Sequence, residues 1–347
     1  MKQIRLSGLL AFLCFVIFAV WVPANPSIFV KLSSKVIWTI DKNAYSGIGI
    51  FFYDNDYIVT PAPETSTDYE FEQVMTLKEK LDADGIELLY VCKPAKYLDD
   101  TIFDQFGEKS YCNRNADKLL SRLDAAGVHT LDLRQEIKND GLDIYQMFYR
   151  TDHHWTVPAG KWGTSKIAKA LNEDCGYGID LSIYDDENYI FKTTPEAWYG
   201  EQGEKLNGSD LKKDDYTLVM PAFETCYATG EETTDFAGSF INDPSACYHY
   251  NYHAESCVNE NIPAGRILFL GDSYDMVTEP FLSLSVHEIN FKLMRNLPEL
   301  DIYEQFIRDS DYDTVIICYA PFMIGAHDDE ESANYKMFAF EPDEPAT

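Results

Sequence analysis

The sequence predicts an α/β protein in which helices cover both faces of a parallel sheet, giving three layers. Two observations support this class. Segments with helical spacing of apolar residues alternate with short apolar runs in the first half of the chain, and two further buried runs occur late in it. Because strands are indicated at both ends of the 347 residues, we expect one sheet assembled from both halves of the chain.

The first helix and strand follow a linker at 61–67. Apolar residues then recur at helical spacing, and Gly85 marks the end of the helix before a strand at 86–91. The apolar positions are Phe71, Val74, Met75, Leu77 and Leu81.

A second helix contains Leu119, Leu120, Leu123 and Ala126, and it ends at Gly127 before a strand at 128–131. Two later strands are predicted at 267–270 and 314–318. We expect a helix at 276–284 after the first of these, and another near 297–307 before the second.

The rest of the chain shows less regular patterns of apolar residues. Residues 25–66 form an N-terminal linker with one short strand at 47–53, ahead of a domain at 67–335. An irregular insertion is expected at about 177–260. It either determines substrate specificity or forms an acidic, solvent-exposed flap. Residues 336–347 are expected to form a flexible tail.

The charge balance limits the partners. There are 28 Lys and Arg residues against 58 Asp and Glu residues, a formal net charge of −30. Such a surface repels nucleic acid, and it repels polyanionic substrates unless local basic residues reverse the field. A neutral or sparsely charged polymer therefore suits this chain better.

The first twenty-four residues resemble a targeting segment, with Lys2 and Arg5 ahead of an uncharged apolar run at 6–22. The segment continues without interruption to the basic residue Lys31, which favours an uncleaved membrane anchor. The alternative is a signal peptide that is cleaved after Ala24. In either case we expect an extracytoplasmic protein. Of the eight cysteines, Cys247 and Cys257 could pair, or these residues could be buried thiols; no zinc site or cofactor is implied.

The strongest chemical signal is Gly271-Asp272-Ser273-Tyr274, directly after a predicted strand and before a predicted helix. A serine at that turn lies at the carboxyl end of a sheet strand, beside helix N–H groups that can stabilise an oxyanion. The alternative interpretation is that Asp272 or Ser273 simply caps the helix.

A serine nucleophile needs a base, and the segment from Thr151 to Thr156 supplies one. If this segment is extended, Asp152 and His154 project to the same side, so that Asp152 can orient His154 toward Ser273. His153 then points the other way, as a hydrogen-bonding or packing residue, and Trp155 packs the loop. Asp-His-His could also bind zinc or manganese, but no further ligand motif accompanies it.

The motif Asp152-His153-His154-Trp155 resembles the signature of the bacterial DHHW protein family. Together with the later Gly271-Asp272-Ser273, it is similar to the SGNH hydrolase-like alginate O-acetylation proteins, in which the Asp-x-His element also precedes the serine. The resemblance implies an SGNH-like fold with a permuted motif order. It also implies a catalytic triad of Asp152, His154 and Ser273.

The resemblance further implies an acyl-serine intermediate, with transfer of an acetyl group to a polysaccharide and a membrane-bound O-acyltransferase as acetyl supplier. An acetylesterase with the same triad, or an inactive glycan-binding or assembly protein, remains open. Weaker similarities place Lys96, Tyr149 and Arg150 near the site. Lys96 could equally be an exposed lysine after a strand, and Tyr274 follows the nucleophile.

Overall fold

The computed structural model describes residues 46, 49–204, 206, 211–223, 227–229, 232–234, 256–297 and 301–342. The predicted targeting segment, Cys247 and the last five residues lie outside this range. Within it, no helix is long and apolar enough to cross a membrane.

One eight-stranded sheet forms the centre of the fold, in the order β4-β3-β12-β10-β11-β9-β7-β8. Five neighbouring strands are parallel. They are β4 (His129–Asp132), β3 (Glu87–Cys92), β12 (Thr314–Tyr319), β10 (Arg266–Gly271) and β11 (Glu288–Leu293). The sheet therefore combines both halves of the chain, as predicted. The strand β11 was not predicted, although its side chains alternate between buried and half-buried positions.

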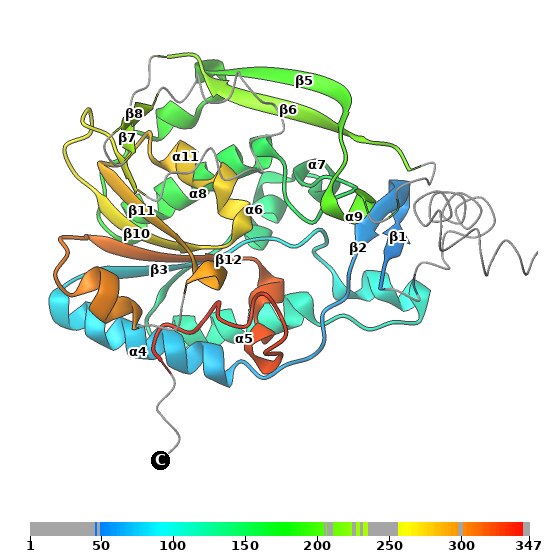
Figure 1. The fold of residues 1–347 in the computed structure, drawn as a ribbon, viewed down its shortest axis with the longest axis horizontal. Helices are drawn as coiled ribbons and strands as arrows, with labels where there is room; N and C mark the ends of the chain where they lie inside the picture. Colours follow the sequence, from blue (N-terminus) through cyan, green and yellow to red (C-terminus); the bar gives the residue numbers. More distant parts are fainter. Residues whose placement is uncertain are drawn as a thin grey trace, which may run out of the picture.

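Helices cover both faces of this sheet (Figure 1). Alternate residues of a strand point to opposite faces. On one face, residues such as Leu88, Leu268 and Val315 pack with α4 (Asp68–Asp84) and α5 (Cys112–Ala125). The opposite face includes Leu89, Phe269 and Ile316. It packs with α6 (Leu133–Asp140), α8 (Val157–Asp174) and α11 (Glu279–Leu282). The predicted three-layer α/β class is confirmed.

The predicted helix at 276–284 is two short pieces. A 3₁₀ helix spans Ser273–Val277, and α11 starts after Thr278 with Pro280 in its first turn. Proline lacks an N–H and fits the first turn of a new helix better than the interior of a continuing one. The helix expected near 297–307 is represented by a π-helical turn at Tyr303–Ile307.

A short strand is present within the range 47–53 where one was expected, and it packs into the fold ahead of residue 67. A hairpin of β1 (Phe51–Tyr53) and β2 (Tyr57–Val59) packs against the short helix α7 (Ile144–Met147) and the following residues. The Tyr57 hydroxyl donates to the Phe148 carbonyl at 2.6 Å, and the Ile58 amide donates to the Arg150 carbonyl at 3.1 Å. Burial of this apolar hairpin makes it part of the fold rather than a linker.

The predicted tail also begins later than residue 336. Met337, Phe338 and Phe340 are buried in the same apolar cluster as α4 and α5. The Tyr319 hydroxyl donates to the Met337 carbonyl at 2.6 Å. Apolar burial therefore holds the chain in place through Phe340.

The segment at 177–260 is more regular than expected. It contains a long antiparallel hairpin of β5 (Tyr189–Trp198) and β6 (Asp214–Pro221), which runs along the top of the view in Figure 1. Between these strands lies the short helix α9 (Glu201–Glu204). The same segment adds β7 (Tyr227–Thr229), β8 (Glu232–Thr234) and β9 (Ser256–Val258) to the edge of the main sheet as antiparallel strands.

Candidate active site

Ser273 lies at the sharp turn that follows β10. Asp272 caps the 3₁₀ helix by accepting the Tyr274 N–H at 2.9 Å, and Asp275 accepts the Asp272 N–H at 3.0 Å. A side chain at residue 271 would place its Cβ 2.6 Å from atoms of Asp275 and Phe291, so that only glycine fits there. The capping interpretation is thus correct for Asp272, and it leaves the Ser273 side chain available for chemistry.

A buried ion cluster lies beneath this turn. Lys93, directly after β3, pairs with Asp272 at 2.7 Å and also with Asp275. Burial opposes the charge of Lys93, but the two aspartates outweigh it and raise its pKa. Burial raises the pKa of Asp275 to about 7, against the opposing effect of Lys93. The other Asp272 oxygen accepts the Ala320 N–H at 2.8 Å, which ties the ends of β3, β10 and β12 together.

The Asp-His-His-Trp segment forms a tight loop ahead of α8. Phe148 and Trp155 pair as a β-bridge, and the Thr156 N–H donates to the Met147 carbonyl at 2.8 Å. Trp155 is fully buried, and its indole N–H donates to the Tyr274 carbonyl at 2.9 Å. Trp155 therefore packs the loop and fastens it to the serine turn.

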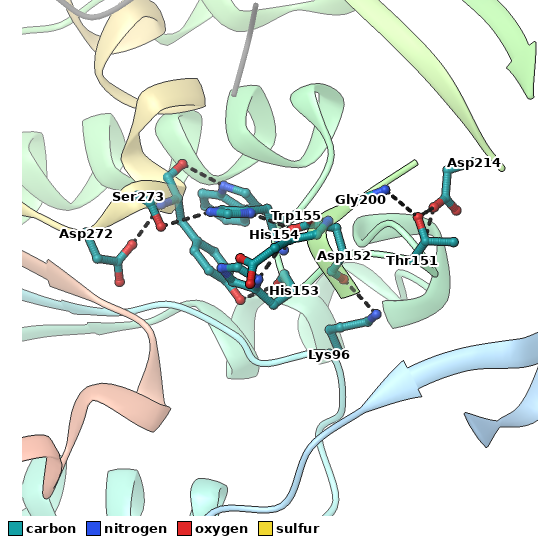
Figure 2. Close-up of polar contacts among 12 residues, drawn as sticks. Lys96, Thr151, Asp152, His153, His154, Trp155, Gly200, Asp214, Asp272 and Ser273 are labelled. Carbon is teal, nitrogen blue, oxygen red and sulfur yellow. Dashed lines mark hydrogen bonds and ion pairs between the residues drawn. The ribbon is translucent and has the colours of Figure 1, made fainter. Parts of the chain in front are cut away.

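These two segments bring the three predicted triad residues together (Figure 2). His154 Nε2 lies 2.8 Å from Ser273 Oγ, and His154 Nδ1 lies 2.5 Å from Asp152 Oδ1. Burial disfavours ionisation of Asp152, but the hydrogen bond and charge of His154 outweigh that effect and hold the Asp152 pKa below its ordinary value. The order of contacts is that of a serine triad.

The insertion supports the aspartate of this arrangement. The second carboxylate oxygen of Asp152 accepts the Glu201 N–H at 2.7 Å, and the Gly200 N–H donates to Thr151 Oγ1 at 2.8 Å. Asp214 accepts the N–H groups of Thr151 at 2.9 Å and of Arg150 at 2.8 Å. Sequence reasoning missed these residues because no local pattern connects them with a loop about 50 positions earlier.

The sequence also failed to single out Lys93, although a signal was present. A lysine that directly follows a buried strand lies at the same sheet edge as a nucleophile turn after a neighbouring strand. A buried lysine charge requires acidic partners that are also buried, and Asp272 was already a candidate site residue.

Three other candidate site residues, Lys96, Arg150 and Tyr149, lie outside the Ser-His-Asp hydrogen-bond chain. The Lys96 ammonium is buried and donates to the carbonyls of Arg150 at 2.9 Å and Asp152 at 2.7 Å, so it supports the loop. Burial lowers its pKa to about 7. The Arg150 side chain pairs with Asp214 at 3.3 Å, and the Tyr149 ring packs against Trp198.

His153 and Tyr274 lie beside the triad. The rings of His153 and His154 have centroids 3.9 Å apart, and burial lowers the His153 pKa to about 4. The Tyr274 hydroxyl donates to the His153 carbonyl, and its ring centroid is 5.1 Å from that of His154.

Asp152, His153 and His154 offer potential metal-ligand atoms that all lie within 4.8 Å of one another. Both ring nitrogens of His154 already face partners, however, and a metal would have to displace Asp152 or Ser273. We therefore expect EDTA treatment to leave any activity that depends on Ser273 unchanged. Recovery of an EDTA-sensitive activity with zinc or manganese would contradict this expectation.

The described residues thus form a mostly parallel α/β sheet of the SGNH-like fold, with a Ser-His-Asp hydrogen-bond chain at its carboxyl edge. Residues 49–212 match the family described as the SGNH hydrolase-like domain of the acetyltransferase AlgX. The matched range includes Asp152 and His154 and ends before Ser273. It confirms the predicted resemblance to the SGNH hydrolase-like acetylation proteins.

Solved structures have the same fold. Bacillus cereus PatB1 with a sulfonyl adduct superposes with a TM-score of 0.63 and 18% identity, over 84% of this chain and 98% of that chain. A DHHW family protein from Eubacterium siraeum gives a TM-score of 0.59 and 16% identity, over 85% of this chain and 96% of that chain. No curated protein matches this sequence significantly.

Proposed function

We propose that this chain is an extracytoplasmic O-acyltransferase that transfers an acetyl group to a hydroxyl of a polysaccharide. Ser273 is the nucleophile, His154 the general base and Asp152 the group that orients His154. The proposal depends on the continuous contacts of 2.8 Å and 2.5 Å from Ser273 through His154 to Asp152. The match to an acetyltransferase family supports the acetyl group as cargo.

The reaction has two balanced steps. Ser273 Oγ attacks the carbonyl carbon of a donor ester while its proton passes to His154 Nε2, and the departing alcohol takes that proton. The acceptor hydroxyl then gives its proton to His154 and attacks the acyl carbon, and Ser273 Oγ leaves and is protonated again. Asp152 stabilises the imidazolium that forms in both steps.

The proposed acceptor is a neutral or sparsely charged glycan of the cell envelope or an exopolysaccharide. The net charge of −30 disfavours a polyanion. The N-terminal segment suggests that the chain is tethered to the membrane, or released by cleavage after Ala24. A tethered enzyme could receive acetyl groups from a membrane-bound O-acyltransferase.

The test uses the full-length protein with 4-nitrophenyl acetate as donor and neutral oligosaccharides as acceptors. If deacylation limits turnover, an acceptor should accelerate 4-nitrophenol release by intercepting the acyl-enzyme, and acetylated sugar should appear by mass spectrometry. Efficient deacetylation of acetylated glycan with no capture by any acceptor would replace the transferase with an acetylesterase.

A further inference from the structure

Lys96 is a buried cation without a carboxylate at ion-pair distance. Its side chain follows β3 and is only 5% exposed. Within the part of the chain that the structure describes, no Asp or Glu oxygen lies within 4.0 Å of its nitrogen, whereas the fully buried Lys93 pairs with two aspartates. Burial of a charge is costly unless other groups compensate it. The atoms that Lys96 contacts therefore indicate the role of its charge.

The Lys96 ammonium binds the main chain on both sides of Thr151. It donates to the Arg150 carbonyl at 2.9 Å and to the Asp152 carbonyl at 2.7 Å, and Figure 2 shows its side chain reaching Asp152. The nitrogen also lies 5.1 Å from the centroid of the Tyr57 ring, within the range of a cation–π contact. Hydrogen bonds from an ammonium group are charge-assisted and stronger than those between neutral groups.

The residue that Lys96 holds by its carbonyl is the one that orients the catalytic base. Asp152 Oδ1 lies 2.5 Å from His154 Nδ1 and accepts the His154 main-chain N–H at 2.9 Å. The second carboxylate oxygen accepts the Glu201 N–H at 2.7 Å. Lys96 adds a contact to the main chain of Asp152, so the side chain and the backbone of this residue are held independently.

Burial has the largest influence on the charge of Lys96, and it lowers the pKa to about 7. The charged side chains around it are Asp152, Asp214 and Arg150, of which the two aspartates favour the ammonium form. His153 is neutral near pH 7, because burial lowers its pKa to about 4. At about pH 6.5 the charged form of Lys96 therefore predominates.

We infer that Lys96 is a positioning residue for the Ser-His-Asp chain, because its ammonium group holds the main chain of Asp152 where the carboxylate orients His154. A neutral donor would bind the two carbonyls less tightly, which explains a charge at a buried position. The inference rests on one part of the proposed function, Ser273 as nucleophile. It holds whether the acyl group passes to a sugar or to water.

The test measures the rate at which phenylmethylsulfonyl fluoride labels Ser273 at about pH 6.5, where Lys96 is mainly charged. Lys96→Ala should lower this rate about 10²-fold, because small displacements of catalytic groups have effects of that size. Lys96 lines a cavity of about 230 Å³, so a small solute can reach the space that the substitution opens.

Chemical rescue shows whether the ammonium group itself is needed. n-Propylammonium matches the atoms that Lys96→Ala deletes beyond Cβ, and it should raise the labelling rate of this variant at least about 5-fold. Two solutes at the same concentration are controls and should not restore the rate. 1-Propanol has a similar size but no charge, and tetramethylammonium is a cation without an N–H donor.

Two further variants separate positioning from packing. Lys96→Met fills nearly the same volume without a charge, and a change of this kind is often tolerated by the fold. It should lower labelling by a similar factor, and n-propylammonium should not restore it. Lys161 provides the matched control, because it is also 5% exposed, donates to the Tyr184 carbonyl at 2.6 Å and lies 4.5 Å from the Tyr189 ring centroid. Lys161→Met should leave the labelling rate unchanged.

Thermal unfolding of every variant accompanies these rates. Labelling of Lys96→Met at more than about a third of the rate of Lys161→Met would overturn the inference, whether or not Lys96→Ala folds. Equal rescue by 1-propanol and n-propylammonium would also overturn it, since Lys96 would then only fill space. Unfolding of both Lys96 variants where Lys161→Met stays folded would make Lys96 a residue of general stability instead. A wild-type protein that is not labelled at Ser273 would contradict the proposed nucleophile itself.

Discussion

Replacement of Ser273 by alanine should lower acyl transfer by roughly 10⁴-fold or more, because the variant lacks the nucleophile that forms the acyl-enzyme. The Ser273 hydroxyl contacts His154 Nε2 at 2.8 Å, and the turn around it is held by Asp272 and Asp275. The variant should therefore fold like the wild-type protein. The rates of 4-nitrophenol release and of sugar acetylation measure the effect.

The same variant can be examined with a covalent probe. Phenylmethylsulfonyl fluoride should add one sulfonyl group to the wild-type protein, located at Ser273 by peptide mass spectrometry, and none at residue 273 of the alanine variant. Ser121→Ala, at an exposed position on α5, is the matched control and should react like the wild-type protein. More than a tenth of the wild-type transfer rate in Ser273→Ala would rule out the proposed triad.

Replacement of Gly200 by alanine should reduce transfer by about 10²-fold, because small displacements of catalytic groups have effects of that size. The added Cβ would lie 2.3 Å from Asp152 Cβ, 2.6 Å from Asp152 Oδ2 and 2.6 Å from the Thr151 carbonyl oxygen. Asp152 or the backbone must move, and His154 then loses its orienting contact. The fall should appear in kcat and in the rate of sulfonyl labelling.

Gly178→Ala is the control for this substitution. It lies in the same insertion, and an added Cβ there meets no heavy atom within 4 Å. Thermal unfolding of both variants would show whether the lost activity reflects a displaced triad or an unfolded protein. Full activity of Gly200→Ala would mean that the insertion does not position Asp152.

The sequence predicted those strands of the sheet that are marked by a local run of apolar residues. The runs at 267–270 and 314–318 are apolar because both faces of these central strands are covered, and Gly85 ends α4 with a left-handed φ of 72°. The three residues of the Ser-His-Asp hydrogen-bond chain could be proposed because each lies in a short motif with its own chemistry. His154 and Ser273 are 119 residues apart, but each motif could be recognised separately.

The contacts that hold the site together were not predictable in this way. Gly200 acts through its backbone N–H, and Asp214 acts through a carboxylate that accepts the Thr151 N–H. Neither residue lies in a sequence pattern that distinguishes it from other glycines and aspartates. The burial of the residues ahead of position 67 was missed for a similar reason. The short hairpin of β1 and β2 is apolar, but only its tertiary partners show that it is buried.

The strand order has a consequence for how the chain can fold. β12 lies between β3 and β10 in the sheet. The strands on its two sides therefore cannot be joined in one sheet until the chain has been synthesised as far as Tyr319. Lys93 likewise acquires its counter-ions only when Asp272 and Asp275 arrive, about 180 positions later. High contact order of this kind slows folding and leaves strand edges exposed to aggregation. A nascent chain that stops short of β12 should therefore be a substrate for chaperones and proteases rather than a partly active enzyme.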